Sequence, residues 1–99
     1  MTLEDFILDY IRQRRSVTFG EVKKAGADAG YPMDGDLELG DDDAYLWSRM
    51  SQEFAEAVSN LVGSQKVRLV PTTQLDIMVT SPIILRAEQP PIPCRLEAN

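Results

Sequence analysis

The chain contains no histidine, and its only cysteine is Cys94. Without histidine it cannot form Ser-His-Asp triads, histidine general bases or the usual zinc sites. A single cysteine cannot form an intramolecular disulfide, which fits a reducing compartment. The phosphate-binding patterns GxGxxG and GxxxxGKS/T are also absent. These absences predict a protein that is not an enzyme and that binds no cofactor.

Long apolar runs are missing as well, because the longest stretches of apolar residues span only a few positions. No segment is therefore long enough to cross a membrane. The N-terminal segment MTLEDFILDY carries acidic residues where a signal peptide has basic ones. The length of 99 residues favours one domain. We expect a soluble protein located in the cytoplasm.

Basic residues are scarce in the middle of the chain. Residues 34–63 hold eight acidic residues and one basic residue, Arg49, which gives a net charge of −7. Residues 1–33 hold five of each sign, and residues 64–99 hold three acidic and four basic residues. The net charge of −6 therefore arises from one third of the chain. A charge run is most often solvated surface, but a salt-adapted surface would spread its acidic residues instead of concentrating them.

The densest acidic run begins with the spacing of a calcium-binding loop. Asp34, Asp36 and Glu38 take the first, third and fifth places of an EF-hand. The sixth place holds Leu39 instead of glycine, and the twelfth holds Tyr45 instead of glutamate. The pattern is therefore not an EF-hand, and we predict no metal site. A loose, weak divalent site stays open.

Two amphipathic helices are predicted in the first third of the chain. Residues 3–14 place apolar side chains at positions i, i+3, i+4, i+7 and i+8, and Thr2 is the expected N-cap. A short β-prone step follows at 16–19. Thr18 and Glu21 have the spacing of a capping box, which predicts the start of a second helix.

The acidic run is predicted to be a loop that leads into the longest helix of the chain, at 43–62. One of the residues from Asp41 to Asp43 should cap this helix, and Gly63 should end it. Apolar residues at helical spacing, beginning with Trp47, would form its inner face.

Two later segments, 66–70 and 75–80, alternate between apolar and polar residues. This alternation predicts a two-stranded antiparallel hairpin. Pairing Leu69 with Leu75 keeps the apolar residues of both strands on one face, because side chains alternate between the faces of a strand.

Residues 1–87 are expected to form the folded domain, and 88–99 a proline-rich, extended and weakly packed tail, because proline cannot donate ladder hydrogen bonds. The predicted core consists of Phe6, Ile7, Tyr10, Val22, Trp47, Met50, Phe54, Val58, Leu61, Val67, Leu69 and Ile77.

The order helix, short strand, helix, longer helix and β-hairpin resembles the winged helix-turn-helix domain. The resemblance covers residues 3 to about 80, and its best local sign is the segment SVTFGEVKK at 16–24. It implies an α+β, winged-helix-like three-helix domain with a C-terminal β-hairpin wing. The connection at 31–43 departs from the family, because it is longer and far more acidic than the usual tight turn.

In winged helices the third helix enters the major groove and the wing touches the DNA backbone. The resemblance places Arg49 on the reading helix and Lys66 and Arg68 on the wing; Lys23 and Lys24, on another face, complete the candidate nucleic-acid contacts. This set implies a DNA-binding transcriptional regulator. The acidic third helix opposes that function, because non-specific DNA affinity comes from Lys and Arg neutralising phosphates.

We therefore favour a non-enzymatic interaction role, in which an acidic surface imitates DNA phosphates toward a basic, nucleic-acid-binding protein partner. In size, charge and fold class, the chain looks like small phage or mobile-element proteins that block nucleic-acid-binding machinery. This likeness holds at the level of the fold alone. The candidate protein-interaction residues are Asp34, Asp36, Glu38, Asp41, Asp42, Glu53 and Glu56.

Overall fold

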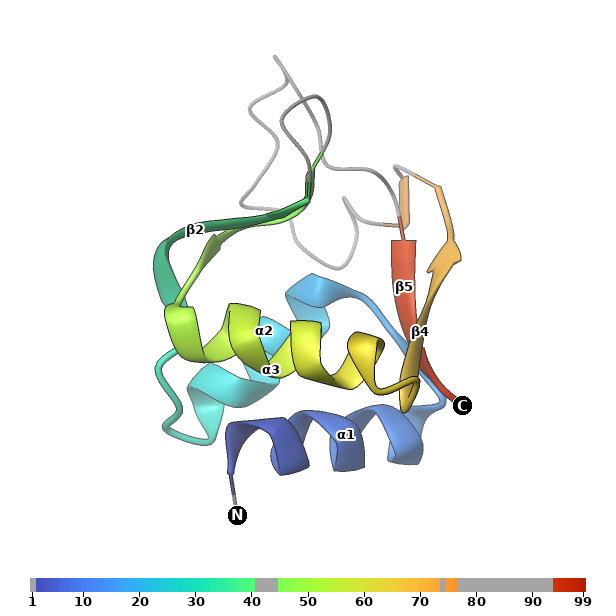
Figure 1. The fold of residues 1–99 in the computed structure, drawn as a ribbon, viewed down its shortest axis with the longest axis horizontal. Coiled ribbons are helices and arrows are strands. Elements are labelled where there is room, and N and C mark those ends of the chain that lie inside the picture. Colours follow the sequence, from blue (N-terminus) through green and yellow to red (C-terminus); the bar gives the residue numbers. More distant parts are fainter. Residues whose placement is uncertain (1, 41–44, 74, 77–93) are drawn as a thin grey trace.

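The computed structural model describes residues 2–40, 45–73, 75–76 and 94–99, and within these ranges the chain forms three helices and two small antiparallel sheets (Figure 1). The helices are α1 (Leu3–Arg14), α2 (Phe19–Asp28) and α3 (Gln52–Gly63). One sheet has the strand order β1 (Ser16–Val17), β5 (Cys94–Ala98), β4 (Val67–Pro71); the other pairs β2 (Asp34–Gly40) with β3 (Tyr45–Met50). None of the described helices has the length and apolar character needed to cross a membrane.

The starts of α1 and α2 confirm the predicted caps. The Thr2 side chain accepts a hydrogen bond from the Asp5 amide at 3.1 Å. Thr18 accepts from the Glu21 amide at 3.2 Å while the Glu21 carboxylate accepts from the Thr18 amide at 3.0 Å, which completes the capping box. Each cap satisfies amides that a helix terminus leaves without an intrahelical partner.

The prediction of one helix over 43–62 is wrong for its first part, because Tyr45–Met50 is a strand and α3 begins at Gln52. Ser51 is the N-cap and accepts from the Phe54 amide at 3.0 Å. Trp47 and Met50 face the core as predicted, but from a strand. A short apolar stretch fits a buried strand as well as a helix, so its periodicity alone does not separate the two.

The preceding acidic segment also differs from the prediction, since it forms strand β2 instead of a loop. It pairs with β3 antiparallel, with Leu39 opposite Trp47 and with irregular register toward both ends. The predicted caps Asp41 to Asp43 lie outside the described residues.

The predicted hairpin between 66–70 and 75–80 is wrong in its partner strand. β4 pairs with β5, so that Leu69 faces Leu96 and Arg68 faces Glu97. Leu75 and Asp76 are helical, and residues 77–80 lie outside the described residues.

The prediction of a weakly packed tail is wrong for residues 94–98, because they form strand β5. β5 lies between β1 and β4, and Leu96 is fully buried opposite both Val17 and Leu69. Residues 88–93, with their prolines, lie outside the described residues. The C-terminal strand is thus the centre of the larger sheet.

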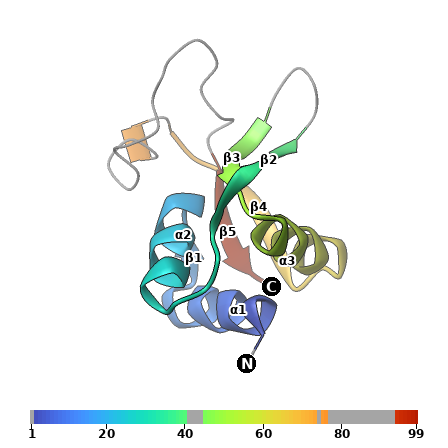
Figure 2. The same ribbon diagram turned by 90° about the vertical axis from the view of Figure 1, so that its left-hand side faces the viewer.

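The hydrophobic core lies between the three helices and this sheet, with α1 beneath α2 and α3 in both views (Figures 1 and 2). Eight predicted core residues are buried: Ile7, Val22, Trp47, Met50, Phe54, Val58, Leu61 and Val67. Phe6, Tyr10 and Leu69 are partly buried, and Ile77 lies outside the described residues. Buried residues absent from the predicted set include Ile11, Val17, Phe19, Met33, Cys94 and Leu96.

Cys94 is expected to be unreactive in the folded protein. Its side chain is buried, and burial raises the pKa of the thiol to about 11, because the thiolate is poorly solvated there. Because this pKa is about two units higher than that of an ordinary thiol, the fraction of reactive thiolate is about 100-fold lower. We expect an aromatic disulfide reagent at pH 8 to label Cys94 rapidly in denaturing urea and negligibly in native buffer. Rapid stoichiometric labelling in native buffer would contradict the burial of β5.

Candidate functional site

The acidic segment forms an arm of the molecule. We define the acidic hairpin as β2, β3 and the connection between them, residues 34–50. It rises on the side of the body away from α1 (Figures 1 and 2). Asp36 and Glu38 are exposed on β2, and Leu37 between them exposes 45% of its surface. Asp41 and Asp42 lie outside the described residues.

The base of the acidic hairpin is anchored in the core by β3. Trp47 is buried, and its ring stacks on Phe19 at the start of α2 with centroids 6.0 Å apart. Met50 is fully buried. A two-stranded hairpin is marginally stable alone in water, so these aromatic and aliphatic contacts hold the arm against the domain.

Ser51 joins the hairpin base to α3. Its amide donates to the Met33 carbonyl at 3.0 Å and its hydroxyl donates to the Pro32 carbonyl at 2.5 Å, while the same hydroxyl caps α3. At Gly35, the backbone of β2 passes close to the backbone of Met50 and Ser51. A Cβ at this position would press against the Met50 carbonyl and lie 2.7 Å from the Cα of Ser51. Glycine is therefore required where β2 passes the start of α3.

Asp34 differs from the other acidic residues of β2 because a cation compensates it. Its carboxylate lies 2.7 Å from the Lys23 ammonium, and the hydrogen bond from Lys23 holds the pKa of Asp34 below its ordinary value. Lys23 also donates to the Arg49 carbonyl at 3.3 Å. Lys23 therefore links α2 to both strands of the hairpin, and Asp36 and Glu38 remain the uncompensated charges of β2 among the described residues.

Helix α3 continues the acidic character of the hairpin. Glu53 and Glu56 are exposed in its first two turns, and Glu56 accepts a hydrogen bond from Gln52 at 2.9 Å. The twelve residues of α3 include no lysine or arginine. Acidic side chains near a helix N-terminus also interact favourably with the helix dipole, so Glu53 has a structural role beside any contact with a partner.

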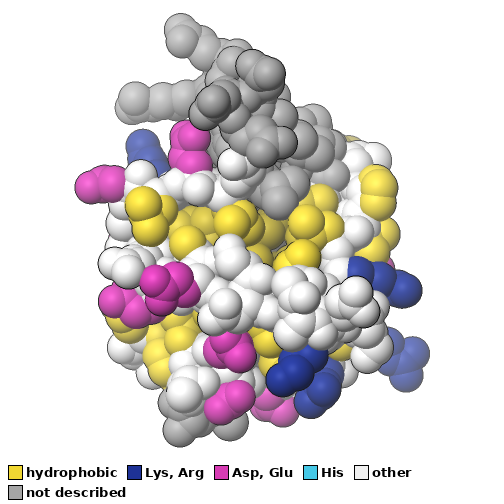
Figure 3. All heavy atoms as spheres, viewed as in Figure 1, with side chains coloured by type: hydrophobic (Ala, Val, Ile, Leu, Met, Phe, Trp, Pro, Cys, Tyr) yellow, Lys and Arg dark blue, Asp and Glu magenta, His cyan; other side chains and the backbone are white. Residues whose placement is uncertain are grey.

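The candidate nucleic-acid contacts come from separate elements of the fold. Arg49 lies on β3 with a φ of +54°, so it does not lie on a reading helix. Arg68 faces Glu97 on the neighbouring strand and pairs with it at 2.9 Å. Lys24 lies on α2, and Lys66 is exposed just before β4. In the view of Figure 3, most of the visible acidic side chains lie toward the side of β2 and most basic ones toward the side of β4, but one basic side chain lies beside the acidic ones near β2.

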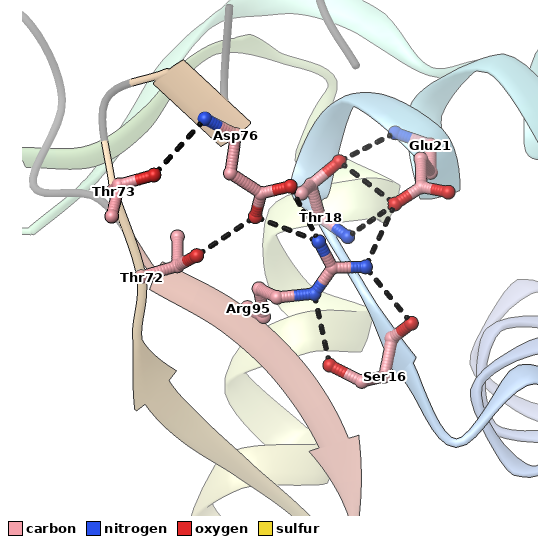
Figure 4. Close-up of polar contacts among 7 residues, drawn as sticks. All are labelled: Ser16, Thr18, Glu21, Thr72, Thr73, Asp76 and Arg95. Atoms are coloured by element: carbon pink, nitrogen blue, oxygen red, sulfur yellow. Dashed lines mark hydrogen bonds and ion pairs between the residues drawn. The ribbon is translucent and has the colours of Figure 1, made fainter. Parts of the chain in front are cut away.

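Sequence reasoning missed a polar cluster around Arg95 (Figure 4). The guanidinium lies 2.7 Å from the Asp76 carboxylate and 3.3 Å from that of Glu21, and it donates to the Ser16 hydroxyl at 2.9 Å. The hydrogen bond from Arg95 holds the pKa of Asp76 below its ordinary value. The residues in contact are up to 79 positions apart in the sequence, so no local pattern indicates these contacts.

The Arg95 cluster is a structural tie rather than a site with open chemistry. It joins β5 to the capping box of α2, and Thr72 donates to Asp76 at 2.8 Å just beyond β4. Its carboxylates are already occupied by the guanidinium. Within the ranges that the structure describes, no three Cys, Asp or Glu side chains are grouped as metal ligands.

In comparisons with known proteins, the chain matched no family model, no curated protein and no solved structure.

Proposed function

We propose that the acidic hairpin and the first turns of α3 bind a basic, nucleic-acid-binding protein, toward which they imitate the phosphates of a nucleic acid. The observation that carries this proposal is the concentration of eight acidic residues and one basic residue within 34–63, together with the exposure of Asp36 and Glu38 on β2. Clustered negative charge steers a basic partner and raises its association rate.

The fold supports a winged-helix-like framework for this arm, which we propose as well. β1 follows α1, β4 and β5 follow α3, and the three strands form one sheet in the order β1-β5-β4. This is the element order of the winged helix with one addition, the acidic hairpin inserted between α2 and α3. In this framework the wing is the connection between β4 and β5, of which residues 74 and 77–93 lie outside the described residues.

The second candidate function, a DNA-binding transcriptional regulator, is favoured by the same framework and opposed by the charges. The third helix would have to approach a polyanion with Glu53 and Glu56 and without a basic residue. Lys23 and Arg68 are compensated by carboxylates of the same chain. Each phosphate contact requires an available Lys or Arg, so these pairs weaken the regulator hypothesis.

The test is an acidic-hairpin variant in which Asp36 and Glu38 on β2, and Asp41 and Asp42 after it in the sequence, are changed to Asn or Gln. Asp34 is kept because it pairs with Lys23. We expect the wild type to capture a basic protein from nuclease-treated extract and the variant to lose it. The wild-type association rate should fall as salt rises, because clustered charge is screened within about 8–10 Å at 0.1–0.15 M.

The matched control removes four other acidic residues, Glu4, Asp5, Asp9 and Asp28, all of them outside the hairpin and α3. It makes the same change in net charge and should keep the partner. If the hairpin variant still captures the partner with an unchanged association rate, the acidic run is solvated surface and not a binding site. Micromolar binding of random duplex DNA by the wild type, lost when Lys66 and Arg68 are replaced by alanine, would instead support the regulator.

A further inference from the structure

A groove between α1 and α2 has a different chemistry from the acidic hairpin. Its volume is about 410 Å³, within the range of ~300–1,000 Å³ that is usual for small-ligand sites. Four of its residues lie at i, i+3, i+4 and i+7 on one face of α2, and the other two lie at i and i+4 on α1. The lining consists of Tyr10, Arg14, Glu21, Lys24, Ala25 and Asp28.

Two cations of the groove are available to a ligand. The ion pairs of the described residues involve Lys23, Arg68 and Arg95, so neither Arg14 nor Lys24 is paired there. The Arg14 guanidinium lies over the Tyr10 ring, 4.7 Å from its centroid. This contact restrains the guanidinium by cation–π attraction, which does not use its N–H donors for an ion pair.

The two carboxylates of the groove differ in their partners. Glu21 accepts hydrogen bonds from the amide and hydroxyl of Thr18 and lies 3.3 Å from Arg95, a guanidinium that it shares with Asp76, so its charge is partly compensated. Asp28 is exposed at the end of α2 and has no ion pair among the described residues. Asp28 is therefore the carboxylate of the groove that opposes an anion most directly.

We propose that this groove binds a phosphate group between Arg14 and Lys24. The planar fork of arginine donates two parallel hydrogen bonds to phosphate oxygens, and lysine adds a compact positive charge. Two further arginines, Arg12 and Arg15, belong to the same end of α1 and are exposed. The phosphate belongs to a nucleic-acid backbone or to a small phosphorylated molecule, which share this chemistry.

The proposal is independent of the acidic hairpin, because the two features share no residue. In the protein–protein proposal negative charge meets a basic partner, whereas here positive charge meets an anion. The acidic-hairpin variant should therefore bind phosphate as the wild type does. Failure of either proposal leaves the other standing.

The test titrates the full chain with pyrophosphate and, separately, with a short oligothymidylate, and follows backbone amide shifts by NMR. We expect the shifts to centre on Arg14 and Lys24. The double variant Arg14→Gln/Lys24→Gln should weaken binding of both probes at least about tenfold, because charge-assisted hydrogen bonds are lost. Asp28→Asn should strengthen binding about two- to fivefold, because an opposing charge is removed.

Lys66→Gln is the control for the pyrophosphate titration, since it removes one exposed lysine outside the groove and should leave the pyrophosphate affinity unchanged. Stronger binding of the oligonucleotide at equal phosphate concentration assigns the site to a nucleic-acid backbone, and equal binding assigns it to a small molecule. Shifts spread over all exposed cations, an equal loss of pyrophosphate binding in the Lys66 variant, or no response to Asp28→Asn would overturn the proposal.

Discussion

Replacing Phe54 with alanine is expected to lower the free energy of unfolding by ~3–5 kcal/mol. Phe54 is fully buried on the inner face of α3, in the same cluster as Ala57, Val58 and Leu61. The change removes apolar contacts and leaves a cavity, since packed surroundings relax only partly. Urea denaturation should show a lower midpoint with an unchanged slope, because the native state keeps its compactness.

Leu37→Ala is the matched control for this measurement, because Leu37 is also a large apolar residue but exposes 45% of its surface on the acidic hairpin. We expect its cost to stay below ~1 kcal/mol, as for most surface substitutions. A Phe54→Ala cost below ~1 kcal/mol would mean that α3 turns another face to the core.

Local signals in the sequence predicted the first two helices well. Thr2, Thr18 and Glu21 act within three residues of their hydrogen-bond partners, so the caps of α1 and α2 can be identified without tertiary information. The apolar periodicity of α1 likewise identified Ile7 as inward-facing, and Ile7 is fully buried.

The prediction was wrong where two patterns fit the same residues. Trp47, Met50 and Phe54 share a helical spacing, but the chain changes from strand to helix at Ser51. Ser51 carried a usable signal, because serine is a strong N-cap residue; the three aspartates at 41–43 carried the same signal and were preferred. Pairing with β2 placed Trp47 in a strand, and such pairing depends on tertiary context.

The candidate site was predictable in composition and only partly in geometry. Asp36, Glu38, Glu53 and Glu56 are exposed, as acidic side chains usually are, so their exposure does not separate an interaction surface from a solvated one. The pairing of Asp34 with Lys23 joins residues from two elements, and no local pattern indicates it. Contacts of this kind require the folded arrangement, because they depend on how α2 and the hairpin pack.

The C-terminal strand β5 is the largest difference between the sequence prediction and the structure. Its removal should also have the largest effect on stability. We expect a chain that ends at Pro93 to lose cooperative folding. Without β5, the strands β1 and β4 lose the strand that pairs with both of them among the described residues. The core loses Cys94 and Leu96, and the Arg95 tie to Asp76 and Glu21 is removed.

Point variants separate these contributions. Leu96→Ala should cost ~2–5 kcal/mol, because the side chain is fully buried. Glu97→Ala is the matched neighbour and should cost below ~1 kcal/mol, because Glu97 is not buried and its ion-pair partner Arg68 is exposed to solvent. Since a domain of this size has a stability of ~5–15 kcal/mol in all, loss of Leu96, the Arg95 tie and a central strand together should exceed it.

The measurement is far-UV circular dichroism and NMR chemical-shift dispersion of the truncated chain across a urea titration. A sigmoidal transition with native chemical-shift dispersion would show that the domain folds without residues 94–99, as expected for a weakly packed tail. Loss of the transition would show that the folded state requires the pairing of β5 with residues near the start of the chain. Such a contact closes a loop of nearly the whole chain, which is why local sequence patterns do not reveal it.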